Sequence, residues 1–358
     1  MKSVPTPFET SVVGSLPRPR WVQELMTEGE SGRLSAPQYG ELCDKATGFA
    51  IGLQEEAGVD LITDGEWRRL GYVEILAQRT TGFEAIDVSD GRYELTGRIR
   101  REQPILLDAL QFLLANTTKR TKVTIPSPYH LSNHSKFDAL AGLYSRETFL
   151  ADLVEVVAQE VADLAQTDVD VIQFDDPRFV YVTMPALSKD LFTRGRGDLK
   201  YEMKLAIESL NRVFAAAGNK RTALHLCHGN SERHTDASGG YETLMPYLHD
   251  LRCDQVLMEY TIPEAGDIGV LKDFPRDKYL GLGAVDVRSV QIDTPEQIVA
   301  RVEAAIDYVD PHRITLNPDC GFAPFMTNAI SIDEPYLKLR AQTAAARELR
   351  KRHGVPNQ

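Results

Sequence analysis

Short runs of apolar and β-branched residues recur along the chain, and most of them are followed by Gly, Pro, Asp or Asn. Several runs are continuously apolar, with no alternation between apolar and polar residues. This pattern is typical of parallel strands that are covered on both faces. We expect eight strands, which span residues 11–16, 61–65, 122–126, 169–174, 222–226, 255–259, 279–285 and 313–316.

Helical patterns separate these runs. Apolar residues recur at three- and four-residue steps between Phe149 and Leu164, which gives one apolar stripe along a helix. Thr294, Pro295 and Gln297 predict a helix that begins with a capping box. The alternation of strands and helices predicts an α/β fold, a (β/α)8 barrel of the TIM type, as a single catalytic domain over residues 1–358. Further helices are expected over residues 42–55, 104–114, 199–216 and 332–350, with a short one near 267–274.

Two segments are too long to be simple connections between a strand and a helix. Residues 78–98 carry β-type residues on both sides of Ser89-Asp90-Gly91, which predicts a hairpin insertion. Residues 179–197 follow the fourth predicted strand, so we expect this loop insertion to lie over the active site.

Composition narrows the classes of function. The formal net charge is −12 and no block of Lys and Arg occurs, which argues against binding of nucleic acid through its phosphates. The first residues lack the apolar core of a secretory signal, and no apolar stretch is long enough to span a membrane. We therefore expect a cytoplasmic protein with reduced cysteines. Cys43 and Cys253 are expected to be packed thiols.

Four residues with metal-binding side chains stand at or just beyond the ends of predicted strands. Strand residues two apart point to the same face, so His225 and Cys227 can face one cavity. Alone, this pair would also fit a core histidine and a packed thiol. A carboxylate directly after an apolar run, as in QVLMEYT, is costly to bury without a partner. The four residues are His225 and Cys227 in ALHLCHGN, Glu259 in QVLMEYT and Cys320 in ITLNPDCGF.

One nitrogen, two sulfurs and one oxygen make a tetrahedral ligand set that suits Zn²⁺ better than iron or copper. Two thiolates and one carboxylate around a divalent cation leave one negative charge, and a substrate thiolate that replaces the carboxylate would not change it. Zinc would act as a Lewis acid on a thiol, whose free pKa is about 8.5. The ligand set therefore predicts alkyl transfer to sulfur in preference to hydrolysis.

Polar residues at other strand ends should face the same mouth of the barrel. Glu66 and Asp175 are candidates to hold a substrate ammonium group, whereas Asp64 and Asp176 would also fit helix N-caps. Asp286 and Arg288 follow the seventh predicted strand, and with Glu259 they are the candidate catalytic residues. Structural or solvated roles are expected for the nearby His130, His228 and His234.

The chain resembles the catalytic domain of cobalamin-independent methionine synthase. The resemblance implies a zinc-containing barrel that moves a methyl group from a methylated tetrahydrofolate to homocysteine. It places the zinc ligands at His225, Cys227, Glu259 and Cys320, and the amino-acid part of homocysteine near Ser15, Glu66 and Asp175. The motifs that carry the resemblance are VVGSLPRP, TDGEWRR, VIQFDDP, HLCHGN, LMEYT, GLGAVDVRS and LNPDCGF.

Three departures from the family pattern affect these expectations. The chain has no room for the second, amino-terminal barrel of the full-length family enzyme, so it resembles the short core form. Arg288 stands where the family usually has a proton-handling histidine, and an arginine stays protonated. The folate-contacting segment before the third predicted strand does not match, so a methylcorrinoid on a partner protein is an alternative methyl donor.

Two other functions remain open from the sequence. A fixed cation at Arg288 would also suit a thiol alkyltransferase that opens an epoxide with a thiol such as coenzyme M. A zinc-binding protein without catalysis is a third reading, but storage of metal does not require acidic residues such as Glu66 and Asp175.

Overall fold

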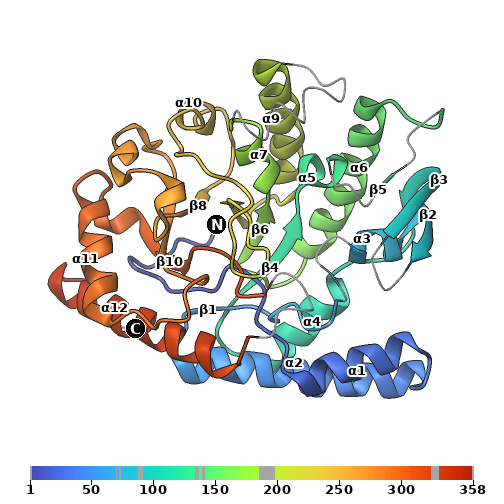
Figure 1. Ribbon diagram of the computed structural model, residues 1–358, viewed down its shortest axis with the longest axis horizontal. Coiled ribbons are helices and arrows are strands. Elements are labelled where there is room, and N and C mark those ends of the chain that lie inside the picture. Colours follow the sequence, from blue (N-terminus) through green and yellow to red (C-terminus); the bar gives the residue numbers. More distant parts are fainter. Residues whose placement is uncertain are drawn as a thin grey trace.

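The computed structural model describes residues 2–69, 71, 74–87, 92–133, 137–138, 142–184, 198–323 and 330–356. Within these ranges, seven strands form one sheet in which every neighbouring pair is parallel. The sheet curls around a central axis, with helices on its outer side (Figure 1). In sheet order the strands are β1 (Leu61–Ile62), β4 (Arg120–Pro126), β6 (Val171–Asp175), β7 (Arg221–Leu226), β8 (Gln255–Glu259), β9 (Tyr279–Val285) and β10 (Ile314–Pro318).

The amino-terminal segment joins the two edges of this sheet. Thr10 forms a parallel bridge with Leu316 of β10, and Ser11 forms one with Leu61 of β1. The expected barrel is confirmed, with seven of the eight predicted strands close to their expected positions.

The strand expected over residues 11–16 is reduced to these bridges. Backbone carbonyls that a strand ladder would use accept hydrogen bonds from side chains instead. Gln342 Nε2 donates to Ser11 O at 3.0 Å, and Gln173 Nε2 donates to Val13 O at 2.9 Å. The closing segment is therefore held by side chains from inside and outside the barrel.

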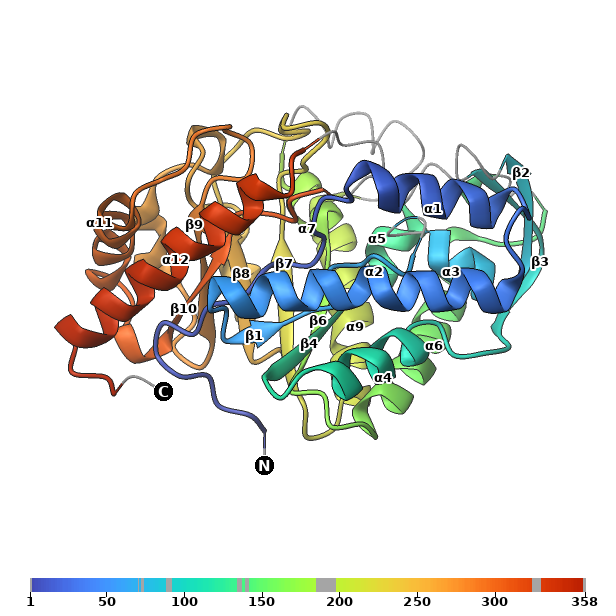
Figure 2. The ribbon, with the colours of Figure 1, turned by 90° about the horizontal axis from the view of Figure 1, so that it is seen from below.

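The predicted hairpin insertion is present. Strands β2 (Thr80–Asp87) and β3 (Arg92–Arg101) pair in antiparallel fashion, and the short strand β5 (Phe137–Asp138) adds to β3 in parallel. This small sheet lies at the edge of the molecule opposite α11 and α12 (Figures 1 and 2). The Ser89-Asp90-Gly91 turn and most of the loop expected over residues 179–197 fall outside the described residues.

Helices occupy the predicted intervals. The capping box at Thr294 is confirmed, because the Thr294 side chain accepts from Gln297 N. The short helix near 267–274 is a 3-10 helix, η2 (Ile268–Asp273). Helix α1 runs alongside the long helix α2 (Figure 2). The α-helices are α1 (Arg20–Glu30), α2 (Ala36–Ala57), α3 (Glu74–Arg79), α4 (Leu107–Asn116), α5 (Pro128–Ser132), α6 (Arg146–Ala165), α7 (Pro177–Tyr181), α9 (Leu199–Ala216), α10 (Met245–Leu248), α11 (Pro295–Ile306) and α12 (Asp333–Arg352).

A small apolar layer closes the barrel interior below the carboxyl ends of the strands. It consists of five buried residues, each from a different segment of the barrel wall. Ala223 lies two residues before His225, and Leu257 lies two residues before Glu259, so each pair faces the same side of its strand. Polar side chains above this layer therefore rest on an apolar floor. The layer comprises Val13, Leu61, Val171, Ala223 and Leu257.

Cys43 and Cys253 are buried free thiols, as expected. None of the helices in the described ranges combines the length and apolar character needed to cross a bilayer.

Candidate metal centre

Strands β7, β8 and β10 bring the four predicted ligands together at their carboxyl ends. His225 lies within β7 and Cys227 directly follows it, Glu259 is the last residue of β8, and Cys320 lies two residues beyond β10. One ligand atom from each residue lies within 4.8 Å of the others, and all four residues are buried. The sequence prediction that these residues share one site is therefore confirmed in its geometry.

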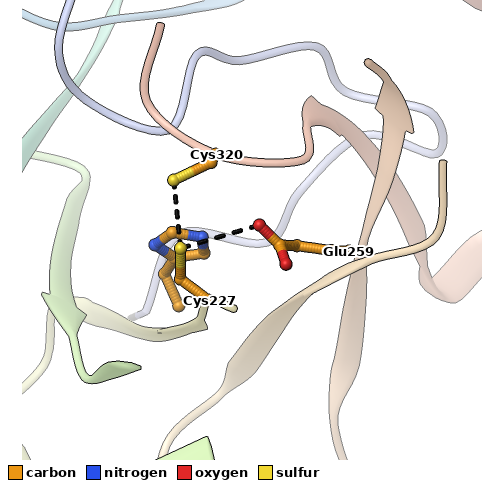
Figure 3. A group of neighbouring side chains, drawn as sticks. Cys227, Glu259 and Cys320 are labelled. Carbon is orange, nitrogen blue, oxygen red and sulfur yellow. Dashed lines mark hydrogen bonds between the residues drawn. The ribbon is translucent and has the colours of Figure 1, made fainter. Parts of the chain in front are cut away.

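The two thiols lie side by side. The Sγ atoms of Cys227 and Cys320 are 3.1 Å apart, and Cys227 Sγ lies 3.6 Å from Glu259 Oε1 (Figure 3). The hydrogen bond between the thiols raises the pKa of Cys227 and lowers the pKa of Cys320. This opposite shift arises because one sulfur donates while the other accepts. Gly229 N also points at Cys227 Sγ, at 3.1 Å, and stabilises negative charge on that sulfur.

Glu259 is fully buried, yet it is held as a carboxylate. Burial acts to raise its pKa, but the hydrogen bond from His228 and the positive charge of Arg288 outweigh burial and lower the pKa to about 2. His228 contacts Oε2 through its backbone N at 2.9 Å and through Nδ1 at 2.6 Å. Arg288 Nη2 donates to Oε1 at 2.8 Å. Glu259 can thus present a charged oxygen to a cation.

His225 has a neighbour at each ring nitrogen. Nδ1 lies 3.2 Å from Asp175 Oδ1, and Nε2 lies 3.2 Å from the carbonyl oxygen of Asp319. Burial acts to lower the pKa of His225, but the hydrogen bond to Asp175 and the charge of Cys320 raise it to about 9. A carboxylate on one nitrogen of a metal-binding histidine fixes the ring orientation. Asp175 is placed to do this at Nδ1, which leaves Nε2 as the nitrogen that could bind a metal.

These residues fit a zinc ion. Four donors at zinc distances of about 2.0–2.3 Å would lie within about 4 Å of one another, so the observed cluster needs only small shifts around an ion, in which the two Sγ atoms, now 3.1 Å apart, move slightly apart and the more distant donors move closer. Thiolate sulfur, imidazole nitrogen and carboxylate oxygen are all zinc ligands. The apolar layer described above lies on the same strands as His225 and Glu259, two residues earlier along each strand.

Glu66 reaches the same region in a strained conformation. Its backbone has φ of 64°, in the left-handed region, and Asp64 Oδ1 accepts from its backbone N at 3.0 Å. Thr124 Oγ1 donates to Glu66 Oε1 at 2.8 Å. Burial raises the pKa of Glu66, Arg69 opposes that rise, and the nearby Asp175 adds to it. Two carboxylates that repel one another in a buried site favour a bound cation between them.

Ser15 lies beside the turn that carries Cys320. Ala323 N points at Ser15 Oγ at 3.3 Å, and Phe322 N donates to Ser15 O at 3.1 Å. A side chain at Gly321 would place its Cβ 2.4 Å from Ser15 Oγ, so this glycine keeps the approach open. The structure therefore brings Ser15 to the metal cluster from the amino-terminal segment.

Asp286 and Arg288 occupy different positions relative to the cluster. Asp286 Oδ1 accepts from the backbone N of Arg288 at 2.7 Å and from that of Ser289 at 3.1 Å, as in an Asx turn. Arg288 itself reaches Glu259. The contacts of Asp286 thus shape the loop that carries Arg288, whereas Arg288 touches a candidate ligand directly.

Three residues near the cluster had no functional role predicted from the sequence. His228 was expected to be structural or solvated; it is fully buried and contacts Glu259. Tyr241 OH accepts from Glu259 N at 3.1 Å and donates to Leu226 O at 3.1 Å, which ties β7 to β8. Asp319 accepts from Tyr260 N at 3.0 Å, and burial with the Glu259 charge raises its pKa to about 7. For His228 and Asp319 the available signal was their position beside Cys227 and Cys320. Tyr241 carried no local signal.

The sequence profile of the family described as cobalamin-independent synthase, catalytic domain, matches residues 8–346. The chain belongs to this family. It shares 28% identity over 361 aligned positions with a methionine synthase from Sulfolobus acidocaldarius, covering 98% of this chain and 96% of that protein. A methionine synthase from Saccharolobus solfataricus is 27% identical, over 87% of each chain.

Solved structures show the same fold. A B12-independent methionine synthase from Shewanella in complex with selenomethionine superposes with a TM-score of 0.77 at 23% identity, covering 97% of this chain and 98% of that one. A methyltransferase from Methanosarcina mazei gives 0.55 at 16% identity, covering 97% and 94%. At these identities the structural likeness supports the barrel alone. The family membership rests on the profile match.

Proposed function

We propose that this protein is a zinc-dependent S-methyltransferase that methylates homocysteine, or a closely related thiol, to give methionine or its analogue. The observation that carries the proposal is the buried cluster of His225, Cys227, Glu259 and Cys320 in a chain of the cobalamin-independent synthase family. The naming of the two archaeal relatives as methionine synthases supports the same acceptor.

The ligand residues would hold the metal next to the mouth of the barrel. When bound, zinc supplies Lewis-acid chemistry that lowers the pKa of a substrate thiol and keeps its sulfur nucleophilic. Gly229 N stabilises the charge on Cys227, and Asp175 fixes the ring of His225. The apolar floor and the burial of all four residues exclude water from the reacting sulfur.

The amino-acid part of the acceptor would lie toward Ser15, Glu66 and Asp175. Glu66 and Asp175 form a buried acidic pair that a substrate ammonium group would neutralise. Ser15 Oγ accepts from Ala323 N and keeps its own proton available for a carboxylate oxygen. Asp175 lies 3.2 Å from His225, so the ammonium site and the metal site are adjacent. A short amino-acid thiol such as homocysteine spans that separation.

The contacts of Arg288 argue against the alternative of a coenzyme M-type alkyltransferase. That alternative rests on a fixed cation that is available to a sulfonate or an alkoxide. Arg288 Nη2 donates to Glu259 and to the backbone carbonyl of Gly229, so its charge is already balanced by a carboxylate. We therefore favour homocysteine as the acceptor, with methyl-tetrahydrofolate or a methylcorrinoid as the donor.

The proposal is tested by replacing one ligand and one matched thiol. Cys320→Ser should lose bound zinc and lower the rate of homocysteine methylation by more than about 100-fold, which exceeds the usual effect of changing a residue behind the ligands. Cys253→Ser, at a buried thiol outside the cluster, should keep the bound zinc and the rate of homocysteine methylation. Metal content by mass spectrometry and methionine formation are the measurements. Full turnover by a metal-free Cys320→Ser protein would reject the proposal.

A further inference from the structure

The carboxylate of Glu259 is bound by two side chains that are not themselves candidate metal ligands. Its outer oxygen, Oε2, contacts His228 at the backbone N and at Nδ1. Its inner oxygen, Oε1, lies 3.6 Å from Cys227 Sγ and accepts from Arg288 Nη2 at 2.8 Å. The oxygen that faces the metal cluster is therefore shared with an arginine.

Both partners of Glu259 are fixed from behind. His228 Nε2 faces the carbonyl oxygen of Gly239 at 2.9 Å, so its ring is held between that carbonyl and the carboxylate. Arg288 also donates to the carbonyl of Gly229, and its loop is shaped by the Asp286 contacts described above. The side chain of Arg288 is only 7% exposed. Neither partner can swing away at low cost.

We propose that His228 and Arg288 form a clamp that competes with the metal for Glu259 and makes this carboxylate a ligand that substrate can displace. We call this pair the Glu259 clamp. The inference rests on the proposed function, because it assigns the clamp a part in exchanging Glu259 for the substrate sulfur. In this assignment Arg288 is a positioning residue.

The physical argument concerns a buried anion. Glu259 is fully buried, so a carboxylate that left a metal without another partner would be an uncompensated charge in the interior. The clamp can provide that partner, because it contacts both oxygens in this structure. When Glu259 leaves the metal, it loses that one interaction, but its carboxylate charge stays paired with Arg288 and His228. An arginine suits this task, because it stays charged and offers several donors in a fixed plane.

The first test uses metal binding alone and needs no substrate. Zinc affinity is measured by competition with a chromophoric chelator for the wild type, Arg288→Met, Glu259→Gln and the double variant. Loss of a neighbouring positive charge tightens zinc binding in either background. If Arg288 holds Glu259, Arg288→Met should tighten binding at least threefold more when Glu259 is present than when Gln replaces it. An equal effect in both backgrounds would overturn the clamp.

The second test follows the exchange itself. Co²⁺ replaces zinc, and the visible absorption spectrum is recorded as homocysteine is added. In Arg288→Met the concentration that gives half of the spectral change should rise at least tenfold, because Glu259 then competes fully for the metal. Arg288→Lys should restore part of this loss. An unchanged homocysteine titration in Arg288→Met would overturn the inference.

Controls separate the clamp from the rest of the site. Arg212→Met removes an exposed arginine that pairs with Glu155, and it should change neither measurement. If the wild-type cobalt spectrum does not respond to homocysteine, the proposed acceptor is wrong, while the chelator experiment still decides whether Arg288 holds Glu259. Thermal unfolding of every variant shows that the comparison is made between folded proteins. His228→Asn weakens the Glu259 clamp at the other oxygen, Oε2, and should weaken homocysteine binding in the same way.

Discussion

The two ends of the barrel differ in the groups that surround their buried carboxylates. At the amino-terminal ends of the strands, carboxylates meet arginines. Glu9 Oε2 accepts from Arg221 Nη2 at 2.5 Å, and its other oxygen is bound by Arg120. Arg350 Nη2 donates to Asp60 Oδ2 at 2.6 Å. At the carboxyl-terminal ends, carboxylates also lie near other acidic groups, as Glu66 does to Asp175 and Glu259 to Cys227. Arg69 near Glu66 and Arg288 on Glu259 balance only part of this acidic cluster.

The difference lies in whether the buried carboxylates are balanced by the protein's own basic groups. At the amino end, Glu9 and Asp60 are paired with arginines, so their charges are balanced without a ligand. At the carboxyl end, burial, together with nearby acidic groups, raises the pKa of Glu66 and Asp319, and a bound cation would stabilise their charged forms. In the function proposed above, the carboxyl end would receive positive ligands, namely a metal ion and a substrate ammonium group. The amino end is built for stability.

Removal of an ion pair at the amino-terminal ends of the strands should give the largest loss of stability. Arg221→Met leaves Glu9 buried with one fewer partner, and we expect the free energy of unfolding to fall by about 3 kcal/mol. Zinc content and the rate per folded molecule should not change. Urea unfolding and metal analysis are the measurements. Loss of zinc without loss of stability would show that the two ends are not separable in this way.

A change in the acidic pair Glu66 and Asp175 should weaken substrate binding without lowering the free energy of unfolding. Glu66→Gln removes one charge that would face the ammonium group, and we expect KM for homocysteine to rise about 10–100-fold, equivalent to about 1.4–2.7 kcal/mol. Because burial already raises the pKa of Glu66, the free energy of unfolding should not decrease. Steady-state kinetics and urea unfolding test both parts.

The matched control for Glu66 is Glu24→Gln, at an exposed carboxylate of α1 that pairs with Arg20. It should leave KM unchanged. A decrease in kcat with unchanged KM in Glu66→Gln would place Glu66 in the chemical step and contradict its assignment to the ammonium group.

The smallest loss of stability is expected for a change away from both ends of the barrel. Thr294→Ala removes the side-chain cap of α11, and the free energy of unfolding should fall by about 1 kcal/mol. Zinc affinity and the rate of methylation should stay as in the wild type. This variant calibrates how much stability can be lost before the site responds. A fall in zinc affinity here would mean that general loosening of the fold accounts for changes at the metal site.

The sequence by itself determined most of the strands and helices and the four candidate ligands, whereas the strand expected over residues 11–16 is reduced to bridges. Apolar runs such as residues 255–259 and the capping box at Thr294 are local patterns, and local burial and capping decide such elements without reference to distant residues. The four candidate ligands could be found because strand ends in a barrel converge on one mouth. The same rule placed Ser15 and Glu66 near the cluster.

Only the tertiary structure decided which side chains contact one another at the mouth of the barrel. Arg288 and Glu259 are 29 residues apart, and no spacing rule relates them. The side-chain bonds that replace a strand ladder at Ser11 come from Gln342, near the other end of the chain. A sequence pattern records which residues are buried or where an element begins. The pairing of buried polar groups depends on distances between segments, and those are fixed only when the whole chain has packed.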